Sequence, residues 1–420
     1  DVVNKFKVVG GSDEAIFQPE WSPGGRLHFV SDRSGWWNLY SLPDTGDDRA
    51  AEALYESDAE FATPAWIFGM RTYDFAPDGG IICAYTRLGS WKLGRLETDG
   101  KLSEFDLPYS DFSSVRVGDG FVILRAGSAK RAAEIVRVEL VTGEAKSISR
   151  PSQVEVAEEN LSDPEAIEFP TDQGGKSAHA FFYPPANEEF AGPEGHKPPL
   201  LVKIHGGPTG ATSATLNMGI QYWTSRGIAV VDVNYGGSTG YGREYRRRLN
   251  GRWGIVDVDD CISAVRFSVV AVAVDDERLA IDGGSAGGFT TLSALTFRNT
   301  FGAGASYYGV SDLEALARDT HKFESRYLDG LIAPYPDRSE VWVERSPINH
   351  VGLLNCPVIL FQGLEDKVVP PNQAEMMVDA LMAKGLPVAY VAYEGEQHGF
   401  RQAANIKRTL EAELYFYSQI

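Results

Sequence analysis

A serine set among glycines offers the clearest chemistry in this sequence. The motif GGSAG at 283–287 follows a short apolar run at 279–281 and precedes a helical pattern at 288–297. A G-x-S-x-G motif between a strand and a helix places the serine on a sharp turn that exposes its hydroxyl group and leaves the next amide near an oxyanion. We therefore predict that Ser285 is a nucleophile and that the Ala286 amide is one oxyanion donor. A purely structural glycine turn is the alternative, whereas the spacing fits neither a dinucleotide motif nor a phosphate-binding loop.

A serine nucleophile needs a general base, and His398 is the candidate. In chains that carry this strand–turn–helix motif, the acid and the histidine follow the serine in chain order. Among seven histidines, only His398 lies beyond the last predicted strand, before a long C-terminal helical pattern. We expect surface or hydrogen-bonded polar roles for His28, His179, His196, His321 and His350.

The acid that orients the histidine is expected after Ser285 and before His398 in the chain, on the loop that follows a later strand. An apolar strand candidate ends at Gly363, and the polar loop that follows contains Glu365 and Asp366. Either carboxylate could orient the imidazole of His398. The residues alone leave this choice open.

A second oxyanion donor is expected after an earlier strand of the same sheet. The loop HGGPTG at 205–210 supplies glycines whose amides a substrate carbonyl can approach, and we predict Gly207 as the donor. His205 has no second ligand at a metal-like spacing. The other candidate cation ligands are Asp257, Asp259 and Asp260. These three lie in the first turn of a predicted helix, where carboxylates are stabilised by the helix dipole without any metal. We therefore expect no metal and no cofactor.

These candidates require a sheet that brings them to one edge. The C-terminal part of the chain alternates strand and helix patterns, which is typical of a largely parallel α/β sheet. The strand candidates are 198–207, 227–237, 278–288, 302–312, 357–366 and 387–399. A helix is predicted at 256–267, where Val258, Cys261, Ile262 and Val265 share one face.

The N-terminal part has a different pattern, with short strands broken by turns. Similar layouts occur at 18–42, 73–97 and, more weakly, 114–140. Their spacing of roughly 40 to 55 residues matches one four-stranded propeller blade. Three blades are fewer than a closed propeller needs, so we predict part of a truncated propeller, with an open antiparallel sandwich as the alternative. The predicted boundaries are a propeller part at 1–150, a linker at 151–163 and a hydrolase domain at 164–420.

Composition limits the partners and the setting of the protein. The net charge of −19 argues against a nucleic acid or an anionic membrane as a partner. No apolar run reaches about 18 residues, so no transmembrane helix is predicted. Three scattered cysteines favour a reducing, cytoplasmic location over a disulfide framework. Because the sequence begins at Asp1 and not at methionine, we expect that a preceding segment is missing.

Five ordered motifs resemble the prolyl oligopeptidase family of serine peptidases, in particular its acylaminoacyl-peptidase and dipeptidyl-aminopeptidase branch. They are HGGPTG (205–210), NYGGSTGYG (234–242), DGGSAGG (282–288), FQGLEDKVVPPNQA (361–374) and YEGEQHGF (393–400). The resemblance is dense over about residues 160–420 and looser over the blade-like part. It implies an α/β-hydrolase fold preceded by part of an all-β propeller.

The resemblance also assigns roles to residues. It implies the triad Ser285, Asp366 and His398, because the family places an aspartate three residues after a glycine, as at Gly363. It implies an oxyanion hole built from the amides of Gly207 and Ala286. Related dipeptidyl peptidases have an assisting tyrosine where this chain has His205, which favours the acylaminoacyl-peptidase branch. By analogy, Phe323 and Tyr327 are expected to line the substrate pocket.

The sequence therefore predicts a serine peptidase that hydrolyses short peptides through an acyl-enzyme. An esterase or amidase for small acyl substrates is the alternative, since the same triad cleaves both kinds of bond. A non-catalytic interaction protein is a third hypothesis, and the complete set of candidate residues argues against it. Short peptides are the expected partners, and the sequence does not exclude a homo-oligomer.

Overall fold

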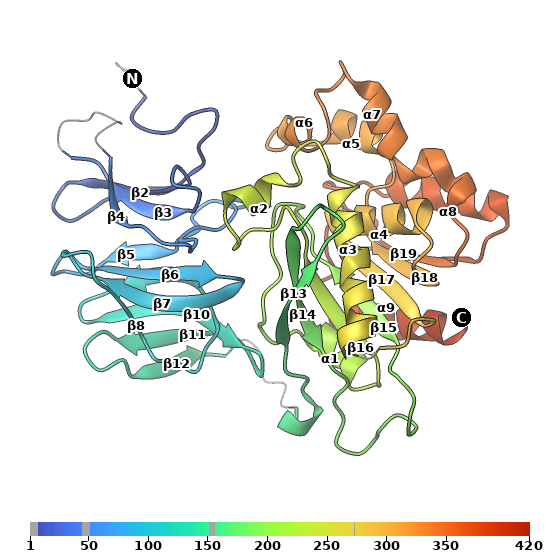
Figure 1. Cartoon of the computed structure of the whole chain (residues 1–420), viewed down its shortest axis with the longest axis horizontal. Coiled ribbons are helices and arrows are strands. Elements are labelled where there is room, and N and C mark those ends of the chain that lie inside the picture. The colour runs from blue at the N-terminus through green and yellow to red at the C-terminus, as the bar shows by residue number, and fades with distance from the viewer. Residues whose placement is uncertain (1–6, 44–50, 151–155, 273) are drawn as a thin grey trace. The chain divides into compact units, whose positions relative to one another are not determined.

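The chain forms two compact units in the computed structural model (Figure 1). The structure describes residues 7–43, 51–150, 156–272 and 274–420. The first unit contains the described residues before 151 together with Ser213–Asn217 and Thr239–Arg246. The second contains residues 156–212, 218–238 and the described part of 247–420. Of the predicted linker at 151–163, the first five residues lie outside the described residues, and the others belong to the second unit.

Within its described residues, the first unit contains three four-stranded antiparallel sheets whose strands follow chain order. The first sheet has β1 (Ile16–Trp21), β2 (Leu27–Ser31), β3 (Asn38–Ser41) and β4 (Glu52–Tyr55). The second has β5 (Tyr73–Phe75), β6 (Ile81–Arg87), β7 (Ser90–Leu96) and β8 (Leu102–Glu104). The third has β9 (Asp111–Val117), β10 (Phe121–Ser128), β11 (Arg131–Glu139) and β12 (Ala145–Ser149). The three sheets coincide with the three repeats in the sequence.

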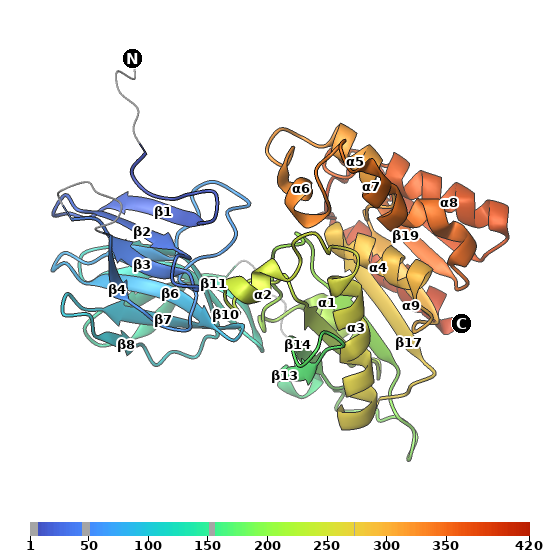
Figure 2. The same cartoon turned by 45° about the horizontal axis from the view of Figure 1, so that its top comes forward.

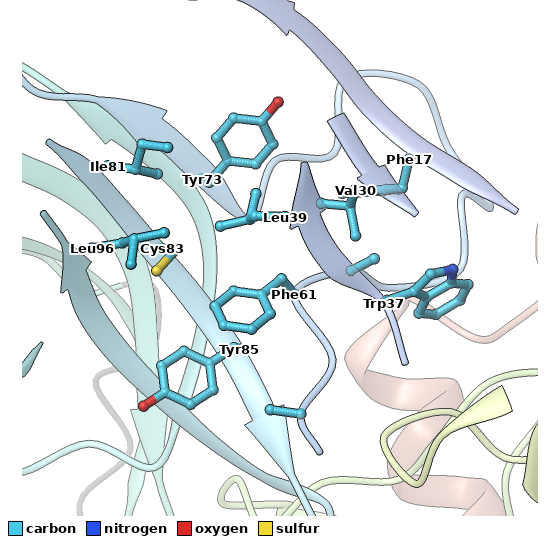
Figure 3. Close-up of a cluster of buried hydrophobic side chains, with 12 residues drawn as sticks. Phe17, Val30, Trp37, Leu39, Phe61, Tyr73, Ile81, Cys83, Tyr85 and Leu96 are labelled. Atoms are coloured by element: carbon cyan, nitrogen blue, oxygen red, sulfur yellow. The ribbon is translucent and has the colours of Figure 1, made fainter. Parts of the chain in front are cut away.

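The sheets of this unit pack through alternate residues of β6, because successive side chains of a strand point to opposite faces. Cys83 and Tyr85 face the first sheet, where Phe61 stacks on Tyr85 with ring centroids 4.9 Å apart. Figure 3 shows Leu39 of β3 among the side chains that fill this cluster. Ile82 and the other residues of opposite parity pack instead against the third sheet. Both faces of β6 are therefore buried, as expected for a middle blade.

A short segment from the later part of the chain, Thr239–Arg246, completes the first unit. Glu60 is fully buried and accepts a hydrogen bond from the Gly240 amide. The guanidinium of Arg246 binds Glu60 at 3.3 Å and Asp32 at 2.6 Å. Most of α2 (Arg243–Arg247) lies in this segment. A buried carboxylate needs such partners, so the segment satisfies polar groups that the three sheets leave inside.

The second unit is built on an eight-stranded sheet in the order β13-β14-β16-β15-β17-β18-β19-β20. Its strands are β13 (Glu165–Pro170), β14 (Ser177–Tyr183), β15 (Leu200–Ile204), β16 (Ala229–Asn234), β17 (Leu279–Gly284), β18 (Ala303–Tyr307), β19 (Val358–Gly363) and β20 (Val388–Tyr393). From β16 to β20 the neighbours pair in parallel, which confirms the six predicted strands. β13 and β14 pair antiparallel and were not predicted.

Helices cover both faces of this sheet (Figure 2). The second unit contains the helices α1 (Met218–Thr224), α3 (Val256–Phe267), α4 (Ala286–Phe297), α5 (Leu313–Asp319), α6 (Tyr327–Leu331), α7 (Ser339–Arg345), α8 (Asn372–Lys384) and α9 (Ala403–Ser418). Of these, α1, α3, α4, α8 and α9 pack against the strands. Gly304 of β18 faces Leu295 of α4, whereas Tyr307 of the same strand donates a hydrogen bond to Glu413 of α9. Residues three apart on a strand point to opposite faces, so α4 and α9 lie on opposite sides of the sheet.

The predicted helix at 256–267 coincides with α3, and all four residues of its predicted apolar face are buried. Among the residues that the structure describes, every helix is too short or too polar to cross a lipid bilayer. The cytoplasmic location expected from the sequence stays a prediction.

Candidate active site

The loops that carry the candidate residues follow neighbouring strands at one edge of the eight-stranded sheet. β15, β17, β18, β19 and β20 run parallel, so their carboxyl ends meet at the same edge. Pairs near these ends include Ile204 with Gly283, Gly284 with Tyr307, and Gly363 with Tyr393. Parallel α/β sheets bind ligands at this edge.

Ser285 occupies a strained turn between β17 and α4. Its φ of 58° and ψ of −120° are rarely adopted by a residue with a side chain. A Cβ on Gly283 would lie 2.4 Å from the Gly287 carbonyl oxygen, so the turn closes only with glycine there. The Ser285 amide donates to the Tyr307 carbonyl at 2.9 Å, and α4 begins at Ala286. The amides of a first helical turn have no partner within the helix, so the Ala286 N–H can face an oxyanion.

His398 binds Asp366 directly. The distance from Nδ1 to Oδ2 is 2.7 Å, and the Asp366 side chain is fully buried. The other carboxylate oxygen accepts hydrogen bonds from the amides of Val368 and Val369, at 2.8 and 3.0 Å. Glu365 is exposed instead. Of the two carboxylates that the sequence leaves open, Asp366 is therefore the one that the structure brings to the imidazole.

The loops that carry Asp366 and His398 are packed against each other. A Cβ on Gly363 would lie 2.4 Å from the Gln397 carbonyl oxygen, and the Glu365 amide donates to the Glu396 carbonyl at 2.9 Å. Backbone contact of this kind fixes the distance between acid and base without relying on mobile side chains.

The loop at 205–210 lies against the serine. A Cβ on Gly206 would stand 3.5 Å from the Ser285 Cβ, and one on Gly287 would stand 3.0 Å from the His205 carbonyl oxygen. Gly207 has a φ of +125°, which L side chains rarely adopt. The structure thus brings the predicted oxyanion loop to the predicted nucleophile.

The His205 ring is half-buried and neutral. Burial lowers its pKa to about 4, against a smaller effect of the Gly206 carbonyl. Because a carbonyl oxygen only accepts, Nδ1–H donates to Gly206 at 2.8 Å, and Nε2 accepts from the Ser238 hydroxyl at 2.8 Å. The ring stacks on Tyr235, with ring centroids 4.5 Å apart. His205 therefore braces the loop through Ser238 and Tyr235.

Comparison with known proteins places this site in a family. The prolyl oligopeptidase family model matches residues 214–420, which contain Ser285, Asp366 and His398. Residues 214–420 belong to the prolyl oligopeptidase family. Over 215 residues this chain is 34% identical to dipeptidyl aminopeptidase BIII of Pseudoxanthomonas mexicana, covering 50% of this chain and 31% of that protein.

Solved structures of the family extend the likeness to nearly the whole chain. The chain is 43% identical to a puromycin-hydrolyzing peptidase of Mycobacterium tuberculosis, with a TM-score of 0.94, covering 97% of this chain and 62% of that one. A puromycin hydrolase gives 41% identity and a TM-score of 0.93 with the same coverage. The chain thus spans less than two thirds of these relatives. The likenesses confirm the predicted fold class, an α/β-hydrolase domain preceded by an all-β region of the propeller kind.

Two residues of the family domain that the sequence did not single out support His398. Tyr308 packs its ring 4.8 Å from the imidazole centroid and has a φ of 39°, which is unusual for an aromatic residue. Glu396 is buried and accepts from the amides of Arg401 and Gln402, each at 2.9 Å, and so ties the histidine loop to the start of α9. The second glutamate of the YEGEQHGF motif, two residues before the histidine, was a signal for Glu396, whereas nothing local marks Tyr308.

The two residues expected in the substrate pocket differ in exposure. Phe323 is 58% exposed. Tyr327 is half-buried, and its hydroxyl group bonds Thr209 of the oxyanion loop. The pocket role of both stays a prediction.

The three aspartates weighed as cation ligands bind different partners in the family domain. Asp257 accepts from Thr290 and the Gly254 amide, Asp260 accepts from the Gly236 amide, and Asp259 pairs with Arg298. Burial raises the pKa of Asp257 to about 6 and that of Asp260 to about 7. Among the described residues, no group of three or more acidic, histidine or cysteine side chains could hold a metal ion.

A second buried polar cluster lies on the α9 side of the same sheet. This α9-side cluster consists of Lys203, Asp282, Tyr307 and Glu413. Lys203 and Asp282 are paired across β15 and β17, with Nζ 2.5 and 2.8 Å from the two carboxylate oxygens. Burial, with the charge of Asp282, raises the pKa of Glu413 to about 8. Glu413 is therefore protonated at neutral pH while Lys203 and Asp282 form an ion pair.

Proposed function

We propose that this protein is a serine peptidase that hydrolyses short peptides and aminoacyl amides through an acyl-enzyme on Ser285. His398 acts as general base, Asp366 orients it, and the amides of Gly207 and Ala286 stabilise the oxyanion. The observation that carries the proposal is the 2.7 Å bond between His398 Nδ1 and the buried carboxylate of Asp366.

That bond determines which nitrogen of His398 can act as the general base. An ionised carboxylate only accepts hydrogen bonds, so Nδ1 carries the hydrogen and Nε2 holds the lone pair that can take the proton of the Ser285 hydroxyl group. The serine oxygen attacks the substrate carbonyl carbon, and the proton on Nε2 then passes to the leaving amine. Water, deprotonated in turn by His398, hydrolyses the acyl-enzyme and releases Ser285.

The substrate class is supported by the relatives that cover nearly all of this chain. Two of them are described as puromycin-hydrolysing, and a serine-to-alanine mutant of puromycin hydrolase was solved in complex with PGG. Puromycin joins an amino acid to a nucleoside through an amide bond. Hydrolysis of puromycin and hydrolysis of a peptide, the reaction implied by the names of the other relatives, would therefore both cleave an aminoacyl amide.

A direct test compares four substrates on the purified chain: an aminoacyl anilide, a dipeptidyl anilide, an acetyl-aminoacyl anilide and a short-chain nitrophenyl ester. Hydrolysis of any anilide, together with fluorophosphonate labelling that Ser285→Ala abolishes, supports a peptidase. Turnover of the ester alone would favour the esterase hypothesis. No labelling and no turnover of any substrate would contradict the proposal for this chain.

A further inference from the structure

Tyr327 contacts the oxyanion loop through its hydroxyl group. The Tyr327 oxygen lies 2.5 Å from Thr209 Oγ1 and accepts a hydrogen bond from the Thr209 amide at 3.2 Å. Burial raises the pKa of Tyr327 to about 12, so the hydroxyl group stays protonated near neutral pH. It therefore accepts from the amide and forms a hydrogen bond with the threonine hydroxyl group, in which either oxygen can be the donor.

The Thr209 amide stands where it can set the orientation of Gly207. A Cβ placed on Gly207 would lie 2.8 Å from the Thr209 nitrogen and 2.9 Å from the Gly210 nitrogen, so the turn folds back directly over Gly207. Because Pro208 alone separates Thr209 from Gly207 in this tight turn, we expect a shift of Thr209 to be transmitted to the Gly206–Gly207 peptide group, which carries the Gly207 N–H. An oxyanion donor must lie within a few tenths of an ångström of its place, because hydrogen bonds weaken steeply with geometry.

Neighbouring contacts hold the rest of this loop, and His205 Nδ1 donates to the Gly206 carbonyl, which belongs to the same peptide group as the Gly207 N–H. Tyr235 is fully buried, and its hydroxyl group donates to the Pro208 carbonyl at 2.8 Å. His205 is held by Ser238 and by stacking on Tyr235. Both tyrosine hydroxyl groups thus bond the loop, but Tyr235 follows β16 of the sheet, whereas Tyr327 begins α6, between β18 and β19.

We infer that Tyr327 is a positioning residue that holds Thr209 and thereby orients the Gly207 amide toward the oxyanion. This inference rests on the proposed function. It differs from the pocket role expected from the family resemblance, because a pocket wall contacts the substrate side chain and changes with substrate size. A residue that orients the oxyanion donor affects every substrate alike, and it stabilises the transition state more than the ground state.

The test uses Tyr327→Phe in the full chain, with small and large side chains on the acyl side of the substrate. We expect kcat to fall on the order of 10-fold to 100-fold for both substrates with little change in KM, since loss of a whole oxyanion donor costs about 10²–10³-fold. The Ki of a peptide aldehyde, which places an oxyanion in the hole, should rise by the same factor. The Ki of a product peptide should not change.

Matched variants separate this effect from general damage. Tyr335→Phe makes the same chemical change in a tyrosine that packs on Trp342, and it should leave kcat unchanged. Thr209→Val should reproduce part of the loss, Thr209→Ser should restore it, and the double variant Tyr327→Phe/Thr209→Val should be little worse than Tyr327→Phe alone. Hydrogen exchange of the amides at 206–210 should be faster in Tyr327→Phe than in the wild type.

Two results would overturn the inference while leaving the proposed function intact. One is a wild-type kcat in Tyr327→Phe. The other is a rise in KM confined to the large substrate, which would show a pocket wall. If the wild type neither labels with fluorophosphonate nor hydrolyses any substrate, the proposed function fails first. In that case unchanged hydrogen exchange at 206–210 in Tyr327→Phe would still reject the positioning role.

Discussion

Two buried polar clusters of the second unit each contain a buried aspartate, but the groups that stabilise its charge differ. In the cluster that we propose as catalytic, formed by Ser285, His398 and Asp366, Asp366 is held by two backbone amides and presents its remaining oxygen to His398, whose side chain is 24% exposed. In the α9-side cluster, Lys203 and Asp282 stand in the middle of paired strands and satisfy each other. The first cluster therefore leaves Nε2 of His398 available as a base, whereas in the second cluster Lys203 and Asp282 neutralise each other.

The difference follows from the elements that carry the residues. Loops at the carboxyl edge of the sheet can supply backbone amides to a carboxylate, so no cation is needed beside Asp366. A residue in mid-strand has its amides committed to the sheet, and a buried charge there needs an opposite side-chain charge. Substitutions in the first cluster should thus change activity with little loss of stability, and substitutions in the second should do the reverse.

The largest expected effect lies in the catalytic cluster. Ser285→Ala and His398→Ala should each lower kcat by a factor on the order of 10⁶, with the double variant little worse, because the two residues act as a unit. Steady-state kinetics and a thermal unfolding scan check this prediction. Retention of a tenth of the wild-type activity by either variant would rule out the assignment.

The next effect distinguishes the two acids of the loop after β19. Asp366→Asn should lower kcat on the order of 10⁴-fold, because an amide in place of the carboxylate favours the wrong tautomer of His398. Glu365→Gln is the matched control and should change kcat less than about threefold. The reverse ranking in the same assay would make Glu365 the orienting acid.

Breaking the α9-side ion pair should cost stability. Lys203→Met leaves Asp282 buried without its cation and should lower the free energy of unfolding by about 3–5 kcal/mol, measured by urea denaturation. The double variant Lys203→Met/Asp282→Asn should recover part of that loss. Activity of the folded fraction should remain within a few-fold of the wild type, and a loss of kcat without a loss of stability would contradict the separation of the two clusters.

The last expected effect is a change in the pH dependence of stability. The pKa of Glu413 is raised from an unfolded value of about 4.3 to about 8. The folded state therefore retains a proton that the unfolded state loses, so this contribution to stability is complete below about pH 4 and disappears as the pH rises through 8. Glu413→Gln imitates the protonated form. Between pH 5 and 9 the wild type should lose stability relative to this variant in urea denaturation, and parallel curves would show that Glu413 does not titrate there.

Local patterns predicted the parts of the site that depend on one strand and its loop. The glycines around Ser285 predicted a strand-to-helix turn, and chain order indicated His398 as the base and the loop at 365–366 as the source of the acid. The choice between Glu365 and Asp366 needed the family resemblance or the structure, because it depends on which side chain the loop turns inward. The ring contact of Tyr308 with His398 and the bond between Tyr327 and Thr209 join residues from separate elements, so no local pattern could indicate them. The strands β13 and β14 were not predicted because they form an antiparallel pair with no helix between them, whereas the prediction relied on strand–helix alternation.

The ion pairs of Arg246 with Glu60 and Asp32 have a consequence for modularity. A gene fragment that encodes residues 156–420 would contain every strand of the eight-stranded sheet. It would also contain Thr239–Arg246, which belongs to the first unit. In such a fragment Arg246 would lack both carboxylates, and in a separate first unit Glu60 would lose its cation. The two units are interleaved along the sequence, so recombination between relatives must exchange this eight-residue segment together with the sheets that hold it.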